Sequence, residues 1–363
     1  TVQGNVAANA IGVVRAANTS VTVDALQSAA IVSANTEQLV VSAGMGDDTT
    51  NVSGTGGPEL TIDGGGNSDN LNITNTAAGT TTVSPGSTSD SGSIQTPDTA
   101  NTTSFAGIEF VSLTGASATD DLALQGTLDN DTITLDGNLA SVNDRAPVTF
   151  SSFDDVSLLG LEGDDTFTVA PTSLTGVTTV AVLGGLGQDS VEVLGSGGAN
   201  AIGFAPTSST AAAVTITGAA TTNITGTELL LIDGAEGNDT LTVTTPAGAT
   251  TTSLTSGATI DSGDVQVASL LAMSFENLGT SGSVVFDDAD PVADDTLVYH
   301  GSGSDDSFGL SATGIVSLNS QLSVDVADDV ATLTLDGLDG DDTFAVTAGH
   351  GIGTVNLSGG GPS

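Results

Sequence analysis

Aspartates that closely follow a glycine are the residues of this chain best suited to chemistry. They occur in Gly46-Asp47-Asp48, Gly163-Asp164-Asp165, Gly187-Gln188-Asp189, Gly237-Asn238-Asp239 and Gly340-Asp341-Asp342. Carboxylates, together with the carbonyls of a glycine-rich turn, are the oxygen ligands that Ca²⁺ prefers. We therefore predict calcium ligands at these corners and at related positions: Asp47, Asp48, Asp69, Asp131, Asp164, Asp165, Asp189, Asp239, Asp264, Asp306, Asp341 and Asp342.

One of these segments carries a resemblance to a known family. GGLGQDSV, from Gly184 to Val191, resembles the G-G-x-G-x-D calcium repeat of the repeats-in-toxin (RTX, haemolysin-type) proteins. The resemblance implies calcium held between stacked turns in a tandem-repeat extracellular surface protein. It covers the corners alone, because the family motif recurs in unbroken tandem and the motifs here are widely spaced. The alternative is that Gly-Asp-Asp is turn chemistry without a metal, since glycine supplies positive φ and aspartate bonds the backbone.

Other residue types that could support catalysis do not form a recognisable set. The triplets Asp90-Ser91-Gly92 and Asp261-Ser262-Gly263 are reminiscent of an aspartic protease, but duplication of the chain explains the pair. His300 and His350 are each next to a glycine, and we expect them to stand alone in polar loops. We therefore predict that the protein is not an enzyme.

The charge balance limits the possible partners. The 363 residues hold 44 acidic side chains and two basic ones, which gives a formal net charge of −42, while 38% of residues are hydrophobic. The hydrophobic content predicts a folded chain. With Arg15 and Arg145 as its basic residues, the chain has no basic surface for nucleic acid or anionic lipid. There is no cysteine for disulfides and no apolar run long enough to insert in a membrane.

Internal repeats indicate how these residues are positioned. Ala8 to Gly12 (ANAIG) recurs at Ala199 to Gly203, and SDSGSIQT from Ser89 recurs as IDSGDVQV from Ile260. We therefore predict two tandem copies, residues 1–187 and 188–363, the first with a loop insertion near 84–103.

A shorter period lies inside each copy. SLLGLEGDDTFTV from Ser157 aligns without gaps with AVLGGLGQDSVEV from Ala181, and Asp48-Thr49-Thr50 aligns with Asp69-Asn70-Leu71. Leu241 and Val265 give a third match. Strand-like alternation at this spacing predicts an all-β fold, a parallel β-solenoid (β-helix) with rungs of about 21–25 residues. The alternative is a pair of tandem β-sandwich domains.

The last residues, TVNLSGGGPS from Thr354, match TVAVLGGLGQ from Thr179, so copy two stops in mid-repeat. An open solenoid end exposes strand edges that need a partner. We expect the chain to be a subunit or a segment of an extracellular structural protein, a cell-surface filament, sheath or surface layer, assembled head to tail and stabilised by calcium. The alternatives are a calcium-dependent adhesin module and a polysaccharide-active β-helix enzyme.

Overall fold

The protein is all-β. The computed structural model describes residues 1–16, 18–24, 31–34, 37–98, 101–290, 294–326 and 330–361. Apart from one short 3-10 turn, η1 (Pro171–Ser173), every regular element among them is a strand. The chain divides into two compact units: unit 1 comprises residues 1–167 and 173–187, and unit 2 comprises residues 168–172 and 188–363. Strand β18 (Thr166–Ala170) and η1 contain the residues at which the division falls.

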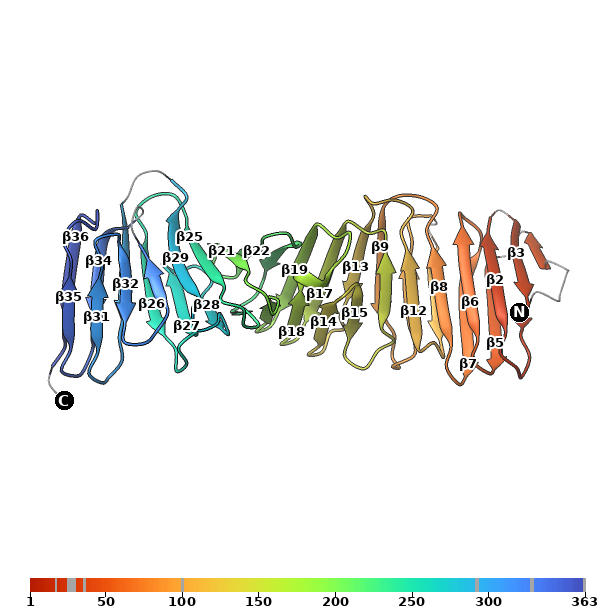
Figure 1. Ribbon diagram of the computed structural model, residues 1–363. Helices are drawn as coiled ribbons and strands as arrows, with labels where there is room; N and C mark the ends of the chain where they lie inside the picture. Colours follow the sequence, from red (N-terminus) through yellow and green to blue (C-terminus); the bar gives the residue numbers. More distant parts are fainter. Residues whose placement is uncertain are drawn as a thin grey trace. The chain divides into compact units, whose positions relative to one another are not determined.

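Unit 1 contains two mixed sheets, whose strands lie side by side in Figure 1. Sheet A has the order β1 (Val2–Gln3), β5 (Gln38–Met45), β7 (Glu59–Gly66), β11 (Thr103–Ala106), β10 (Gly92–Gln95), β9 (Thr80–Pro85), β13 (Asp121–Gln125), β17 (Asp155–Glu162) and β19 (Thr179–Leu186). Sheet B has the order β4 (Ile31–Ala34), β3 (Asn18–Val23), β2 (Ala10–Arg15), β6 (Thr49–Gly54), β8 (Asn70–Thr74), β12 (Phe110–Thr114), β16 (Val148–Ser151), β15 (Leu139–Val142) and β14 (Thr132–Asp136).

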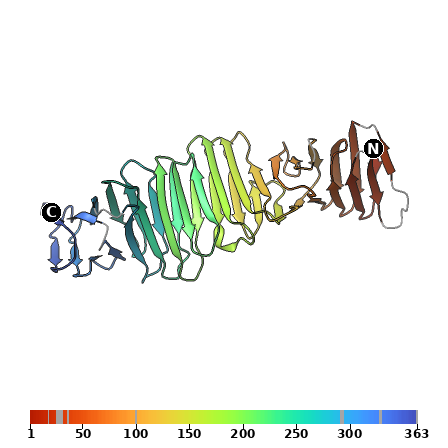
Figure 2. The same cartoon turned by 90° about the horizontal axis from the view of Figure 1, so that it is seen from above.

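Unit 2 is built in the same way, and Figure 2 gives a second view of its strands. Sheet A has the order β23 (Thr221–Thr225), β22 (Ala211–Ile216), β21 (Ala201–Ser208), β25 (Thr240–Thr245), β29 (Ser283–Asp288), β33 (Ser323–Asp325), β32 (Ile315–Leu318), β31 (Ser307–Leu310) and β35 (Thr343–Val346). Sheet B has the order β20 (Ser190–Leu194), β24 (Leu229–Asp233), β28 (Met273–Glu276), β27 (Gly263–Val267), β26 (Thr251–Ser256), β30 (Asp295–His300), β34 (Val330–Asp336) and β36 (Thr354–Ser358).

Successive parallel neighbours have two different spacings. Gln38 pairs with Glu59, Asp155 with Thr179 and Thr332 with Thr354, which are spacings of 21, 24 and 22 residues. These agree with the predicted 21–25. Other parallel neighbours are farther apart in the sequence, from 34 residues between β13 and β17 to 45 between β26 and β30. The longer spacings arise because two extra strands are inserted.

The inserted strands form antiparallel meanders. They are β2–β3–β4, β14–β15–β16 and β26–β27–β28 in sheet B, and β9–β10–β11, β21–β22–β23 and β31–β32–β33 in sheet A. Along the chain the meanders alternate between the two sheets. The segment 84–103, predicted to be a loop insertion, contains strand β10 and the ends of β9 and β11 of one meander, and the other residues that the structure describes there are turns and bends. The match of Leu241 with Val265 was wrong as a rung, because Val265 belongs to β27 and pairs antiparallel with Leu254.

Aliphatic columns form the core. Along strands such as β13 and β17, alternate side chains are buried, as expected for a sheet with one covered face. Leu124, Leu158 and Val182 lie opposite one another on three neighbouring strands and are 0–2% exposed. Where sheets A and B meet in unit 2, Tyr299 of β30 contacts Phe308 of β31 edge to face, with 5.8 Å between ring centroids. The strands therefore hold the turns between the sheets at fixed positions.

Candidate functional site

The predicted calcium ligands fall into three environments. Buried or half-buried are Asp48, Asp69, Asp131, Asp165, Asp189, Asp239, Asp306 and Asp342. Exposed are the first aspartates of the pairs, Asp47, Asp164 and Asp341. Asp264 is also exposed, but it lies within strand β27, where its Oδ1 accepts a bond from the Ser274 hydroxyl at 2.6 Å. We call the buried and half-buried group the inner aspartates.

The inner aspartates join neighbouring strands through main-chain hydrogen bonds. The Asn9 N–H donates to Asp48 Oδ1 at 2.5 Å, and the Asp48 N–H donates to Asp69 Oδ1 at 2.7 Å. The Asp69 N–H donates in turn to Glu109 Oε2 at 2.6 Å. Each side chain thus accepts the N–H of the preceding member of the series. The two residues are 39, 21 and 40 positions apart at the three successive steps. We call this series the inner ladder.

Two corners carry the same set of contacts, one in each unit. Asp131 Oδ2 accepts the N–H of Thr127 at 2.5 Å, and its own N–H donates to Asp165 Oδ1 at 2.8 Å. In unit 2, Asp306 Oδ2 accepts the N–H of Ser302 at 2.6 Å, and its N–H donates to Asp342 Oδ1 at 2.9 Å.

An asparagine completes each of these two corners. Asn143 Nδ2 donates to Asp131 Oδ1 at 2.5 Å, and Asn319 Nδ2 donates to Asp306 Oδ1 at 2.6 Å. Both asparagines have positive φ, 49° and 48°, a conformation that asparagine tolerates. The hydroxyls of Thr127 and Ser302 also lie within hydrogen-bond distance of both oxygens of Asp131 and Asp306, respectively. Each of these carboxylate oxygens therefore has two donors nearby, which occupy the lone pairs that a metal would need.

A glycine lies five residues before every inner aspartate except Asp48, which has Ala43 at that position. A Cβ on Gly160 would collide with Asp165 Oδ2, and the same holds for Gly234 with Asp239 and Gly337 with Asp342. The pattern is therefore Gly-x4-Asp, in addition to the glycine two residues before the aspartate that the sequence made conspicuous. The sequence shows this five-residue spacing, but the prediction of the aspartate sites rested on the nearer glycine alone.

Burial sets the electrostatics of the ladder. Asp69 is 1% exposed, and its burial, with the nearby carboxylates of Asp48 and Glu109, raises its pKa to about 6 despite the hydrogen bond from the Asp48 N–H. Burial also raises the pKa of Asp239, to which Asp233 contributes. Among the described residues, the Oδ2 atoms of Asp48, Asp69 and Asp239 have no hydrogen-bond partner. A protonated carboxyl at such a position can donate to a nearby carbonyl.

Several members of the ladder were missed by the sequence analysis. They are Asn9, Glu109, Asp120, Asn200 and Glu228. Asn9 and Asn200 belong to the repeated ANAIG segments, and their N–H groups donate to Asp48 and Asp239, respectively. Asparagine was passed over because only carboxylates were considered as ligands. Glu228 accepts the N–H of Asp189 at 2.8 Å, so a longer side chain can serve the same purpose.

The basic and titratable side chains outside the ladder have structural partners. Arg15 is 4% exposed and donates to the Pro58 carbonyl at 2.8 Å and to Thr103 Oγ1 at 2.9 Å. Arg145 donates to the Gly86 carbonyl at 2.8 Å. The expectation that His300 stands alone in a loop was wrong: it ends strand β30, and its Nδ1 lies 3.0 Å from Asp336 Oδ2.

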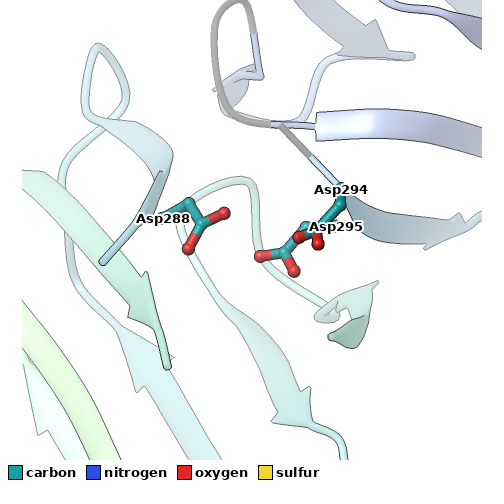
Figure 3. A group of neighbouring side chains, drawn as sticks. All are labelled: Asp288, Asp294 and Asp295. Carbon is teal, nitrogen blue, oxygen red and sulfur yellow. The ribbon is translucent and has the colours of Figure 1, made fainter. Parts of the chain in front are cut away.

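A separate acidic group lies in unit 2, and Figure 3 shows its three carboxylates around one space. Asp288 is the last residue of β29, Asp295 is the first of β30, and Asp294 precedes it. One oxygen from each lies within 4.8 Å of the others. Among the described residues, this is the sole group of three or more acidic, histidine or cysteine side chains that meets this geometry, and it includes none of the predicted ligands.

Comparison with protein-family models and with curated proteins finds no match for this chain. Within the part of the chain that the structure describes, no helix has the length and apolar character needed to cross a membrane.

Proposed function

We propose that the chain is a non-enzymatic structural protein of the cell surface, a β-solenoid of two tandem copies that assembles head to tail. The inner ladder is the observation that carries this proposal. Its carboxylates accept main-chain N–H groups of neighbouring strands, as Asp69 does from Asp48 at 2.7 Å. A typical hydrogen bond within a folded protein contributes about 0.5–1.5 kcal/mol to stability. Acidic side chains used in this way fix the register between strands and do not form a catalytic group.

The strands of the last described pair support the assembly part of the proposal. In the described residues β35 pairs with β31 alone and β36 pairs with β34 alone, so each has one free edge. Val346 on β35 is 42% exposed and Leu357 on β36 is 50% exposed. Free edges with exposed apolar side chains favour pairing with another strand. In this proposal a second copy supplies that strand through a non-closing, head-to-tail contact.

The proposal also includes calcium at the Gly-Asp corners, but with fewer carboxylate ligands than the sequence alone suggested. The carboxylates of Asp131 and Asp306 already accept hydrogen bonds from N–H and O–H donors. The exposed outer members Asp47, Asp164 and Asp341 are more accessible to solvent. Calcium at these corners would therefore take most of its oxygens from main-chain carbonyls and water.

Light scattering and negative-stain electron microscopy of the purified chain test the assembly. We expect filaments with a regular repeat, and we expect removal of residues 1–11 to abolish them. Leu357→Asp should also prevent assembly, because it replaces an exposed apolar side chain on β36 by a charged one at the proposed contact. The matched control is Leu229→Asp on β24, a strand that is paired on both sides and whose side chain is 56% exposed. Filaments that form equally well from all three variants would contradict the proposal.

A further inference from the structure

We propose that Asp288, Asp294 and Asp295, together with the Thr252 hydroxyl, form a calcium site in unit 2. This site is separate from the Gly-Asp corners, since none of its aspartates follows a glycine. It does not depend on the structural function proposed above.

The site is located where the chain passes from one sheet to the other. Asp288 is the last residue of β29 in sheet A, Asp295 is the first residue of β30 in sheet B, and Asp294 precedes it. Their carboxylates approach a shared space from opposite sides in Figure 3. The oxygens lie within 4.8 Å of one another, so a point exists that is at most about 2.8 Å from all three, close to the calcium–oxygen distance of about 2.3–2.6 Å. One calcium ion can therefore reach all three carboxylates.

Two buried oxygens without a hydrogen-bond partner are a second reason to expect a ligand here, independent of the clustering of the carboxylates. Thr252 is 2% exposed and lines the same cavity as Asp288 and Asp295, and its Oγ1 has no partner among the described residues. Asp288 is 9% exposed, and its Oδ2 has no partner either. A buried hydroxyl and a buried carboxylate oxygen without donors are unfavourable unless something else satisfies them.

The second buried carboxylate, Asp295, is held in position by its neighbours. Asp295 Oδ2 accepts the Thr245 hydroxyl at 2.5 Å, and its Oδ1 accepts the N–H of Thr250 at 2.7 Å. A carboxylate oxygen has two lone pairs, so each of these atoms can accept one hydrogen bond and still bind a cation. The two threonine contacts thus orient Asp295 and leave it free to act as a ligand.

Charge favours a cation at this place. The carboxylates of Asp288, Asp294 and Asp295 each place an oxygen within 4.8 Å of the others, a distance at which like charges repel. The only Lys or Arg residues in the sequence, Arg15 and Arg145, both belong to unit 1 and bond to main-chain carbonyls there. A divalent ion would neutralise the repulsion among the three aspartates.

The donor set selects the class of metal. All the candidate ligands are oxygens, without nitrogen or sulfur, which suits a hard cation and not a zinc or copper ion. Mg²⁺ requires near-ideal octahedral geometry at about 2.1 Å, whereas Ca²⁺ accepts irregular arrangements and longer bonds. The wide spacing and unequal burial of the three carboxylates fit calcium.

Isothermal titration of the EGTA-treated full chain with CaCl₂ tests the site. Asp294→Asn is the first variant, because Asp294 is exposed and the substitution preserves shape. Asp288→Asn is the second. The control is Asp63→Asn, the same change at an exposed position on β7 that is not among the predicted ligands. We expect both site variants to bind one calcium ion fewer, or to bind it at least 10-fold more weakly, and the control to behave like the wild type. Isotherms of both site variants that superpose on the wild type would overturn the proposal.

Terbium luminescence gives a second measurement on the same proteins. Tyr299, the single tyrosine in a chain without tryptophan, lies four residues after Asp295 on β30. At about 3.3 Å per residue it is roughly 13 Å from the site along the strand. We expect Tb³⁺ emission sensitised by tyrosine in the wild type, displaced by calcium and reduced in Asp294→Asn. Emission equal in the wild type and in Asp294→Asn would contradict the assignment.

Discussion

Replacing Asp69 by asparagine should stabilise the protein at neutral pH. Asp69 has a pKa of about 6 in the folded chain, compared with 3.8 for an ordinary aspartate. A carboxyl group with a raised pKa binds its proton more tightly when folded, so its favourable contribution is complete below about pH 4. This contribution is lost as the pH rises through 6. The difference of about two pH units corresponds to at most about 3 kcal/mol in the free energy of unfolding.

The structure explains why asparagine fits at this position. Its Oδ1 can keep the hydrogen bond from the Asp48 N–H, now 2.7 Å long. Its Nδ2 would take the place of Asp69 Oδ2, which has no hydrogen-bond partner. Asp69 Oδ2 and the Gly107 carbonyl both lie beside Gly64, at the point that a Cβ on this glycine would occupy, so this carbonyl is the acceptor we expect for Nδ2. Asn9 already shows this arrangement, because its Nδ2 donates to the Ala43 carbonyl at 3.2 Å.

Thermal melting followed by circular dichroism from pH 4 to pH 8 measures the effect. One kcal/mol shifts the melting temperature of a unit of this size by about 2–4 °C, so Asp69→Asn should melt up to about 6–12 °C higher at pH 7. The advantage should shrink towards zero at pH 4. Asp63→Asn, which removes an exposed charge on β7, is the control and should not reproduce this pH dependence. A variant no more stable than the wild type at pH 7, or equally advantaged at pH 4, would refute the reasoning.

Substitutions at two further positions test the ladder. Gly160→Ala should lower the free energy of unfolding by about 1–3 kcal/mol or more, because its Cβ would collide with Asp165 Oδ2 and the Gly184 carbonyl; Gly66→Ala, which meets nothing within 4 Å, is the control in urea denaturation. Asn319→Ala should cost about 1.5–3 kcal/mol, since it removes the donor to Asp306 and places alanine at a φ of 48°. Asn319→Asp at pH 7 should be at least as damaging because it adds a second charge, and a neutral result for both variants would argue against the ladder.

The all-β class could be predicted from the sequence because alternation is a local property. In Asp165-Thr166-Phe167, the buried residues are the first and third, and the same parity holds along the strands that follow the other inner aspartates, apart from Asp342. This parity also separates the exposed Asp164 from the buried Asp165, although the sequence analysis treated both as ligands. The 24-residue match between Ser157 and Ala181 is a parallel pairing in the structure.

The meanders could not be predicted in the same way. A strand in a meander alternates like any other strand, so Val265 resembles Leu241 although it pairs antiparallel with Leu254. Whether two segments pair depends on the residues between them, and the Ser/Thr-rich stretch from Ser84 resembles a loop. The acidic group at Asp288 was also invisible to motif reasoning, because its members come together through the crossing from β29 to β30.

The meanders also determine how the chain should yield under tension. Strand β9 is held between β10 and β13, and β13 pairs with it from 41 residues farther along, at Thr80 and Asp121. A pulled chain therefore cannot release β9 until the later segment has come away. Length should be released in steps of about 14 nm, from roughly 3.4 Å for each extended residue, instead of the about 7 nm of a 21-residue turn. Each meander should therefore delay the release of its first strand until the later parallel strand has separated from it.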